Sequence, residues 1–358
     1  MNVKKVIIGF FFIAILLIAV EIIIGNWFSN KKILINGNIP FNVEWKFPYY
    51  NEVNLVDNFI YIRNGDGLRE EIDKNANKVV FVFGGSNVDQ RRIPLEYTTT
   101  YQLNKNNDSI FYLNMGIDGH TIIGNLYSIK NWVKLLNIQR EKNLGAIIVL
   151  SLNDAALPFY NIAYDQQILE LNEIPERNSG IRKLYLITKN LYDLKSKNNS
   201  HLGHSKIDYE KINYSPKEIS YENHKLIILN SEKYRLYLKS FISELKLLGL
   251  NSFLCLSYPN TLTKRTMNIH DGNYGFDNSY YDGNEIKMNS LEFSESYKSN
   301  LKVMEEECLK AGGFFKDIQQ INENKYFYNH AHLNITGQMI YNNIVENTIS
   351  KNNIFKGN

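Results

Sequence analysis

The stretch FVFGGSNVDQ, residues 81–90, is a run of apolar residues that ends abruptly at two glycines and a serine. The apolar run begins at Lys78 and shows no alternation of polar and apolar side chains, which is typical of a central parallel strand buried on both faces. Glycine lets the backbone turn sharply and stay close to a bound molecule. The stretch therefore predicts a buried strand over residues 78–83 whose carboxyl end presents the hydroxyl of Ser86.

Further apolar runs of this kind follow along the chain, and helical patterns separate them. The predicted strands cover residues 110–113, 146–152, 251–256 and a short run that opens at 313–315. The predicted helices cover residues 122–136, 234–248, 294–311 and 337–349, with apolar side chains at helical spacing. Strands that alternate with helices indicate an α/β fold with a central parallel sheet.

The N-terminus carries a long apolar run, VIIGFFFIAILLIAVEIIIGNWF, at residues 6–28. About 20 such residues span a bilayer core. A cleaved signal peptide has a shorter apolar core and a small-residue cleavage site, which this run lacks, so an uncleaved transmembrane helix is predicted. Lys4 and Lys5 are opposed by Lys31 and Lys32, and only weakly favour a cytoplasmic N-terminus with the remaining chain extracytoplasmic.

Length and charge limit the class of protein further. The chain has 358 residues, and its 40 basic and 37 acidic side chains leave a net charge of +3, too balanced to predict a nucleic-acid partner. The predicted organisation is an anchor at 1–30, a linker and lead-in at 31–75, and one domain at 76–352 with an insertion at about 158–230. Cys255 and Cys308 are both expected to be buried free thiols.

Ligands of an open α/β sheet bind at the carboxyl ends of its strands. Three polar loops stand at such ends: residues 84–87, residues 114–119, and the pair Asn153 and Asp154. His332 precedes the last predicted helix. Each feature alone is commonplace, since a Gly-Gly-Ser turn is usually only a turn and an Asn-Asp pair usually caps a helix. Their order along the chain is the informative signal.

That order resembles the SGNH hydrolase superfamily, the GDSL-type esterases and lipases, and in particular its membrane-anchored bacterial members. Residues 84–86 match the first block, with Gly85 where the name-giving motif has Asp, and residues 114–119 match the second. Residues 151–154 match the third, with serine in place of its glycine, and residues 329–337 match the last. The resemblance implies a three-layer α/β/α domain. Residues 64–69, NGDGLR, also look like the lead-in of anchored members.

The resemblance also implies roles for the matched residues. Ser86 corresponds to the nucleophile that forms an acyl-enzyme, and His332 to the general base. The N–H groups of Ser86 and Gly119 and the side-chain amide of Asn153 correspond to the oxyanion hole. No cofactor and no metal is implied. The pair His330 and His332 suggests a metal only weakly, because a third ligand is missing.

One position departs from the family. The acid that precedes the histidine by three residues is Asn329 here, which carries no charge to stabilise an imidazolium. Three interpretations are open: a Ser–His dyad oriented by Asn329 or a backbone carbonyl, a substitute carboxylate of which Asp317 is the nearest in sequence, or a site too weak to cleave.

The expected function is a membrane-anchored serine esterase. It would hydrolyse or transfer O-acyl esters of a small molecule or polysaccharide, O-acetyl groups on a surface carbohydrate being one such substrate. The alternative is a weakly active or inactive module of the same fold that binds cell-surface polysaccharide or assists its assembly.

Overall fold

The computed structural model describes residues 42–51, 54–73, 76–107, 109–136, 138, 142–157, 218–260, 290–328 and 332–355, together with short pieces at 9, 15–19, 21, 32–33, 39, 174–175, 214–216, 268–270, 280–281 and 284–285. Among these residues no helix is both long and apolar enough to cross a membrane. The predicted anchor at 6–28 lies mostly outside them and stays a prediction.

The chain divides into two compact units. One comprises residues 1–36 and 171–203, and the other comprises residues 37–170 and 204–358. In the first unit, β1 (Lys32–Ile33) pairs antiparallel with β7 (Ile174–Pro175). This division differs from the predicted one, because it splits both the expected linker at 31–75 and the expected insertion at 158–230 between the units.

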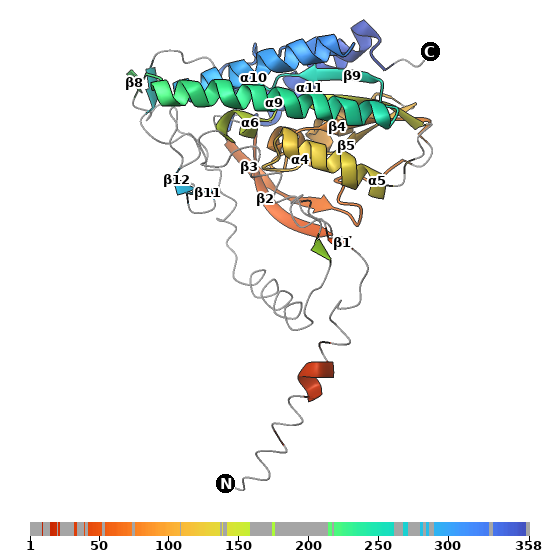
Figure 1. The fold of residues 1–358 in the computed structure, drawn as a ribbon. Helices are drawn as coiled ribbons and strands as arrows, with labels where there is room; N and C mark the ends of the chain where they lie inside the picture. The colour runs from red at the N-terminus through yellow and green to blue at the C-terminus, as the bar shows by residue number, and fades with distance from the viewer. Residues whose placement is uncertain are drawn as a thin grey trace. The chain divides into compact units, whose positions relative to one another are not determined.

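The second unit is built on a five-stranded parallel sheet, drawn as arrows in Figure 1. Its strand order is β13-β9-β6-β4-β5, and the strands are β4 (Lys78–Phe83), β5 (Ile110–Asn114), β6 (Asn143–Val149), β9 (Ser252–Leu256) and β13 (Phe314–Lys316). The strand β4 lies between β6 and the edge strand β5 and is buried from Val79 to Phe83. From β4 the chain first passes to β5 on one side and then returns to β6 on the other side. Open α/β sheets bind ligands at the point where the strand order reverses in this way.

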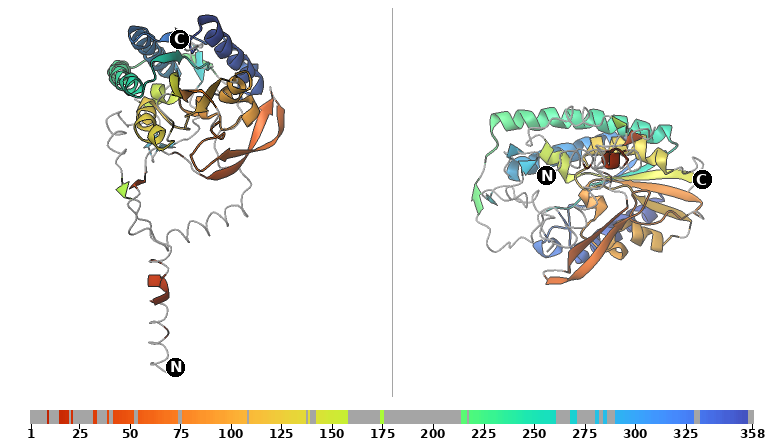
Figure 2. Two further views of the ribbon diagram at one scale, coloured as in Figure 1. Left: turned by 90° about the vertical axis from the view of Figure 1, so that its right-hand side faces the viewer. Right: turned by 90° about the horizontal axis from the view of Figure 1, so that it is seen from below.

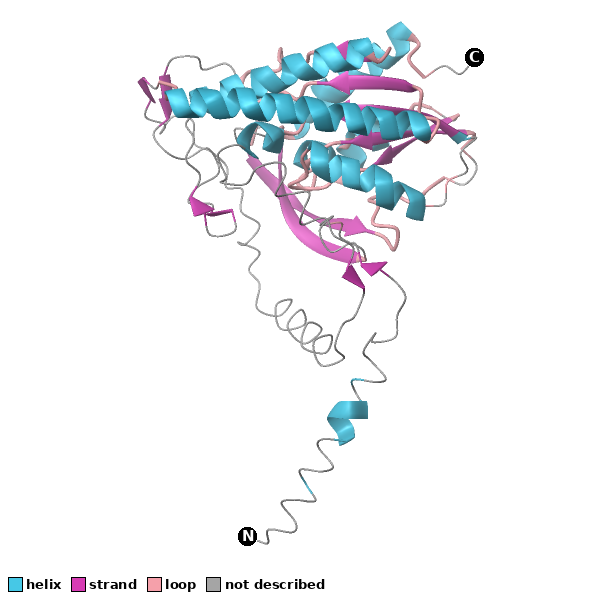
Figure 3. Cartoon of the chain, viewed as in Figure 1, coloured by secondary structure: helices cyan, strands magenta, loops and turns pink. Residues whose placement is uncertain are grey.

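Helices cover both faces of this sheet, as the left view of Figure 2 and the colouring of Figure 3 show. The helices α4 (Ile122–Tyr127), α9 (Tyr221–Leu247) and α10 (Ser290–Lys310) pack together on one face. The helices α3 (Thr99–Lys105) and α11 (Ile335–Asn352) pack together on the other. This arrangement is the one expected from right-handed crossovers, which are the rule for parallel strands, because the step from β4 to β5 runs opposite to the later steps across the sheet. The three-layer α/β/α architecture is thereby confirmed.

All four predicted helices differ in their bounds from the observed ones, and two of them differ in more than their bounds. The helix expected at 122–136 is continued after α4 by a π-helical segment, η2 (Ser128–Trp132), and then by α5 (Val133–Leu135). The helix expected at 234–248 begins earlier, at Tyr221, because the Ser220 side chain caps it by accepting from the Asn223 N–H at 3.1 Å. The predicted insertion at about 158–230 therefore overlaps the first turns of α9, in which Ile227 and Asn230 are buried.

Short elements complete the described structure. They are α2 (Ser86–Asp89), η1 (Leu95–Tyr97), α6 (Leu152–Ala156), β8 (Tyr214–Pro216), β10 (Asn268–His270), β11 (Tyr280–Tyr281), β12 (Asn284–Glu285) and η6 (Asn324–Tyr326). Of these, α2 and α6 follow β4 and β6 directly and carry residues of the candidate site.

An antiparallel hairpin, β2 (Val43–Asn51) with β3 (Asn54–Arg63), precedes the sheet. Alternation along β3 buries Tyr61 and Arg63 and exposes Ile60 and Ile62. These residues fall within the stretch that was expected to be linker and irregular lead-in. That expectation was wrong for the hairpin, because its inward side chains hydrogen-bond to Asp89 at the end of α2.

Cys255 of β9 and Cys308 of α10 form a disulfide, with their Cα atoms 6.4 Å apart. The prediction of two buried residues was correct, since both are fully buried, but the prediction of free thiols was wrong. The two cysteines meet because α10 packs on β9. They are separated by 53 residues in the sequence.

Candidate active site

Ser86 is the first residue of α2, directly after the turn that ends β4. The turn uses glycine because there is no room for a side chain at Gly85: a Cβ there would lie 2.6 Å from the Ser151 Oγ and 2.8 Å from the carbonyl oxygen of His120. Ser86 itself is half-buried. A buried strand and a tight turn thus hold the hydroxyl at the carboxyl end of the sheet, as the sequence predicted.

His332 lies against this hydroxyl. Its Nε2 is 2.8 Å from the Ser86 Oγ, and the imidazole is 9% exposed. The Tyr328 N–H donates to the His332 carbonyl at 3.1 Å, and the Tyr328 ring stacks on the imidazole with centroids 5.5 Å apart. The next backbone N–H, that of Leu333, donates to the Tyr258 hydroxyl at 3.4 Å. Backbone and ring contacts together fix the histidine beside the serine.

The three predicted oxyanion donors come from α2, from the loop at residues 115–119 after β5, and from α6. Gly119 is exposed and has a φ of +83°, a left-handed conformation that favours glycine. The Asn153 amide Nδ2 lies 3.4 Å from the His120 carbonyl, one residue beyond Gly119. It would also lie 3.4 Å from a Cβ on Gly85. The two helices and the loop therefore converge next to Ser86.

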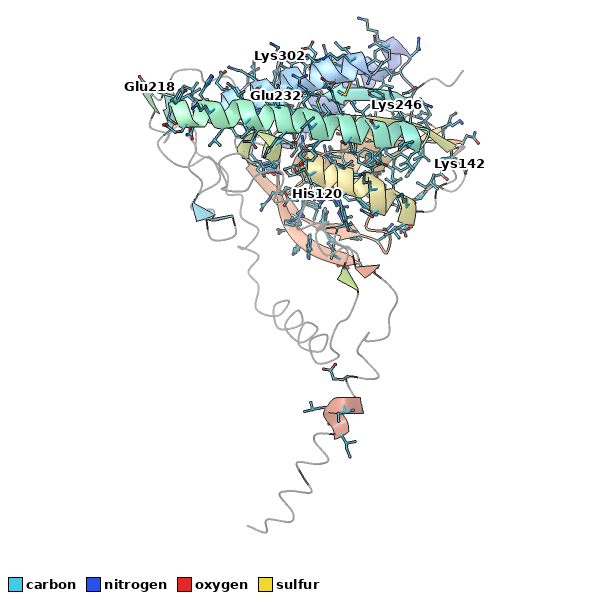
Figure 4. The ribbon with its side chains drawn as sticks, viewed as in Figure 1. His120, Lys142, Glu218, Glu232, Lys246 and Lys302 are labelled. Carbon is cyan, nitrogen blue, oxygen red and sulfur yellow. A yellow bond between two sulfur atoms is a disulfide. The ribbon has the colours of Figure 1, made fainter. Side chains whose placement is uncertain are left out.

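Ser151 replaces the glycine that the third family block usually has, and its side chain forms two hydrogen bonds. Its Oγ donates to the His120 carbonyl at 2.6 Å and accepts from the Asn153 N–H at 3.2 Å. The same oxygen occupies the space that a side chain at Gly85 would need. The two departures from the family pattern, Gly85 for Asp and Ser151 for Gly, are thus complementary in space. His120, labelled in Figure 4, lies two residues before the start of α4, and its carbonyl accepts the bond from the Ser151 Oγ.

Two further polar residues of the matched blocks hold the loops in place. Asp154 accepts from the Ile122 N–H at 2.9 Å, so it caps α4, whereas α6, the helix that contains the Asn-Asp pair, is capped by Ser151. Asn87 donates to the Leu150 carbonyl at 2.8 Å and accepts from the Gly85 N–H at 3.0 Å. It joins the nucleophile turn to the end of β6.

The position of the family acid, Asn329, lies outside the described residues, as does His330. The substitute considered from the sequence, Asp317, follows β13 and accepts from the Ser257 hydroxyl at 2.6 Å and from the Gln319 N–H at 3.1 Å. Within the described part of the chain, no group of three or more His, Cys, Asp or Glu side chains could hold a metal ion.

A buried ion pair adjoins the site. Asp89, the last residue of α2, and Arg63 are both fully buried, with Nη2 and Oδ1 2.6 Å apart. Burial by itself raises the pKa of Asp89, but the charges of Arg63 and Arg91 outweigh it and lower the pKa to about 2. Burial and the Asp89 carboxylate together raise the pKa of Tyr61 to about 12. Asp89 is therefore ionised and Tyr61 neutral at physiological pH.

Sequence reasoning missed several residues of this arrangement, namely His120, Tyr328, Arg63 and Asp89. The only advance signal for Arg63 was the lead-in motif that follows it at residues 64–69. Ser151 was noted as a departure from the family without a role. Nothing in the local pattern marked Tyr328, whose contribution depends on its ring contact with His332.

No protein-family model and no curated protein matches the chain. Similar solved structures include a lipase/acylhydrolase from Enterococcus faecalis, at 11% identity and a TM-score of 0.39, covering 77% of this chain and 96% of that one. A member of the lipolytic protein G-D-S-L family from Veillonella parvula has 10% identity and a TM-score of 0.37, with coverages of 75% and 97%. An acetylxylan esterase from Geobacillus stearothermophilus has 12% identity and a TM-score of 0.39, with coverages of 76% and 94%.

At such identities and TM-scores the likeness carries no statement about the chemistry of this chain, which has to come from the chain's own residues.

Proposed function

We propose that the protein is a serine ester hydrolase of the SGNH type. The observation that carries the proposal is the 2.8 Å distance between the His332 Nε2 and the Ser86 Oγ, two atoms from residues 246 positions apart. A base must lie within about 2.6–3.2 Å of the hydroxyl whose proton it removes. A buried imidazole held at that distance from a serine at a strand end is the arrangement that nucleophilic catalysis requires.

The proposed reaction has two steps through an acyl-serine. The Ser86 Oγ attacks the ester carbonyl while His332 takes the hydroxyl proton, and the tetrahedral intermediate places a negative charge on the former carbonyl oxygen. The N–H groups of Ser86 and Gly119 and the Asn153 amide donate to that oxygen. The intermediate then expels the alkoxide, which receives the proton from His332. Water, activated by the same imidazole, releases the acid.

His332 is proposed to act in a Ser–His dyad, with Asn329 at the position of the family acid. Its backbone bond to Tyr328 and the stacked ring hold the imidazole in place. Asn329 can accept from the far imidazole nitrogen through its amide oxygen, although a neutral amide stabilises the imidazolium much less than a carboxylate does. Asp317 is the weaker choice of acid, because it is already bonded to Ser257 and Gln319.

The protein is further proposed to be anchored in a membrane by residues 6–28, with the catalytic unit outside the cytoplasm. The disulfide between Cys255 and Cys308 supports this, because disulfides persist in oxidising compartments and are rare in the cytosol. An ester of a surface polysaccharide, such as an O-acetyl group, suits an enzyme in that position. Water and a sugar hydroxyl are both possible acceptors of the acyl group.

A fluorophosphonate probe and a p-nitrophenyl acetate assay test the proposal. The wild type should be labelled at Ser86 and turn over the ester, and Ser86→Ala should do neither. Asn153→Ala should lower kcat about 10²-fold, as expected for loss of one oxyanion donor. Ser243→Ala, on the exposed side of α9, is the matched control and should behave as the wild type.

A wild type that is neither labelled nor active on a panel of acyl esters would refute the esterase. It would favour the second candidate, a binding or assembly module of the same fold, for which the loss of the family acid at Asn329 is the motivating observation. Full activity in Ser86→Ala would show that another group is the nucleophile.

A further inference from the structure

The nucleophile helix α2 and the loop at residues 115–119 meet at one buried carboxylate, that of Asp89. Its Oδ2 accepts from the Asp118 N–H at 3.0 Å, and Asp118 directly precedes Gly119. The loop also packs on the helix backbone, since a Cβ on Gly116 would collide with the Asp89 N–H and with Val88. The proposed oxyanion donor Gly119 is therefore one residue away from a charge-assisted hydrogen bond to the end of the helix that carries Ser86.

Arg63 holds the same loop from the opposite side of the carboxylate. Its Nη2 donates to the Asp89 Oδ1 at 2.6 Å and to the Gly116 carbonyl at 2.5 Å, and its Nη1 donates to the Gly67 carbonyl at 2.6 Å. Both members of the ion pair thus contact the loop, Arg63 at the carbonyl of Gly116 and Asp89 at the N–H of Asp118. Arg63 can bond to Asp89, Gly116 and Gly67 at once because the donors of its planar guanidinium point in fixed directions.

The rest of the lead-in closes around the end of α2. The Tyr61 hydroxyl donates to the Asp89 Oδ1 at 2.6 Å and also accepts from the Arg63 Nε. Arg69 donates to the carbonyls of Asp89, Gln90 and Ile93 at 2.9, 2.8 and 3.0 Å. These contacts explain why a hairpin that lies outside the parallel sheet is packed against the site.

A gain in folding stability does not by itself explain why the Arg63–Asp89 ion pair is buried. Burying two charges has a desolvation cost that can exceed their attraction, and apolar replacements of similar volume are often neutral or stabilising. A buried ion pair whose hydrogen bonds all have partners does hold the groups around it in fixed positions, because charge-assisted hydrogen bonds are short and directional. Here the directed bonds end on two peptide groups of the loop that contains Gly119.

We propose that the Arg63–Asp89 pair is a positioning element of the oxyanion hole. Asp89 orients the chain at Asp118, and with it the N–H of Gly119, relative to Ser86 on the same helix. The proposal rests on the proposed esterase function. It makes the N-terminal hairpin a required part of the active site, acting through the loop and not through contact with the reacting atoms.

Asp89→Asn tests the proposal in the full-length protein. The amide has the same size but carries two N–H donors on one of its ends, so it cannot accept from Arg63, Tyr61 and Asp118 together. We expect kcat for p-nitrophenyl acetate to fall tenfold to a hundredfold, because small misplacement of a catalytic group has an effect of that order. KM should stay within about threefold. Hydrogen exchange of the peptide covering residues 115–121 should accelerate.

Controls separate positioning from general stability. Glu307→Gln weakens another ion pair, in which the Arg235 Nη1 lies 2.7 Å from the Glu307 Oε1 between α10 and α9. It should lower the thermal unfolding temperature and leave kcat and exchange at residues 115–121 unchanged. Arg63→Lys is the second test variant: it keeps the positive charge and loses the fork that reaches Gly116, and it should reproduce the kcat loss in milder form.

A folded Asp89→Asn or Arg63→Lys variant with kcat within threefold of wild type would overturn the proposal. So would a rise in KM at constant kcat, which would indicate a role in substrate binding. If the wild type shows no turnover and no labelling of Ser86, the esterase proposal fails. Exchange at residues 115–121 then reports only whether the Arg63–Asp89 pair holds this loop, and unchanged exchange in both variants would refute that role.

Discussion

Gly85→Ala should disturb both stability and catalysis, because the new Cβ would lie 2.6 Å from the Ser151 Oγ and 2.8 Å from the His120 carbonyl oxygen. Overpacking of this kind costs about 1–3 kcal/mol. Ser151 can rotate away, but it then loses its 2.6 Å bond to His120, worth about 1 kcal/mol. We expect a loss of about 2 kcal/mol in unfolding free energy. We also expect at least a tenfold loss in kcat, because His120 directly follows the donor Gly119.

A double-mutant cycle isolates the contact between the two positions. Ser151→Gly alone removes the bonds to His120 and from the Asn153 N–H, and should cost about 1–2 kcal/mol. In the double variant the side-chain part of the clash is gone, while the backbone part at His120 remains. The combined loss should therefore be smaller than the sum of the single losses by about 1 kcal/mol.

Urea unfolding followed by tryptophan fluorescence measures the four free energies, and p-nitrophenyl acetate turnover measures kcat. Gly65→Ala is the matched control, because a Cβ there meets only Asn42 at 3.5 Å, an ordinary contact. It should change stability by no more than about 0.5 kcal/mol. Additive losses in the cycle, or a Gly85→Ala variant with wild-type stability and kcat, would refute the complementary packing of Gly85 and Ser151.

Three further outcomes are expected. Asn329→Asp should raise kcat/KM on an acetate ester about tenfold, equivalent to about 1.4 kcal/mol of barrier, through better stabilisation of the His332 imidazolium; a clear fall would show that Asn329 does not occupy the acid's position. Because the folded pKa of Asp89 is lowered from 3.8 to about 2, roughly 2 kcal/mol of stability is present above pH 4 and lost as the pH falls from about 4 toward 2; acid unfolding should show this dependence in the wild type, and Asp89→Asn should lack it. Replacing both Cys255 and Cys308 by Ala should lower the unfolding free energy by about 4 kcal/mol, the chain-entropy value for a crosslink across 53 residues, and a change below about 1 kcal/mol in urea unfolding would contradict this.

Local pattern was sufficient for the sheet, and the resemblance to the family predicted the contact between Ser86 and His332. The strand predicted over residues 78–83 is β4, and the serine that follows it begins a helix at the carboxyl end of the sheet. His332 could be paired with Ser86 from the sequence alone, because the four family blocks occur in order along the chain. Burial on both faces and helical spacing are properties of short segments, so they can be read without knowing which segments meet.

Contacts between segments distant in sequence were decided only by the tertiary structure. The disulfide depends on α10 lying against β9, and the bond between Ser151 and His120 depends on two loops from different strands meeting beside Gly85. The Arg63–Asp89 pair requires the hairpin to fold back on α2. Periodicity reports how a segment is buried but not what it is buried against. The roles of these residues therefore follow from the packing of the layers, which brings together side chains that no local pattern relates.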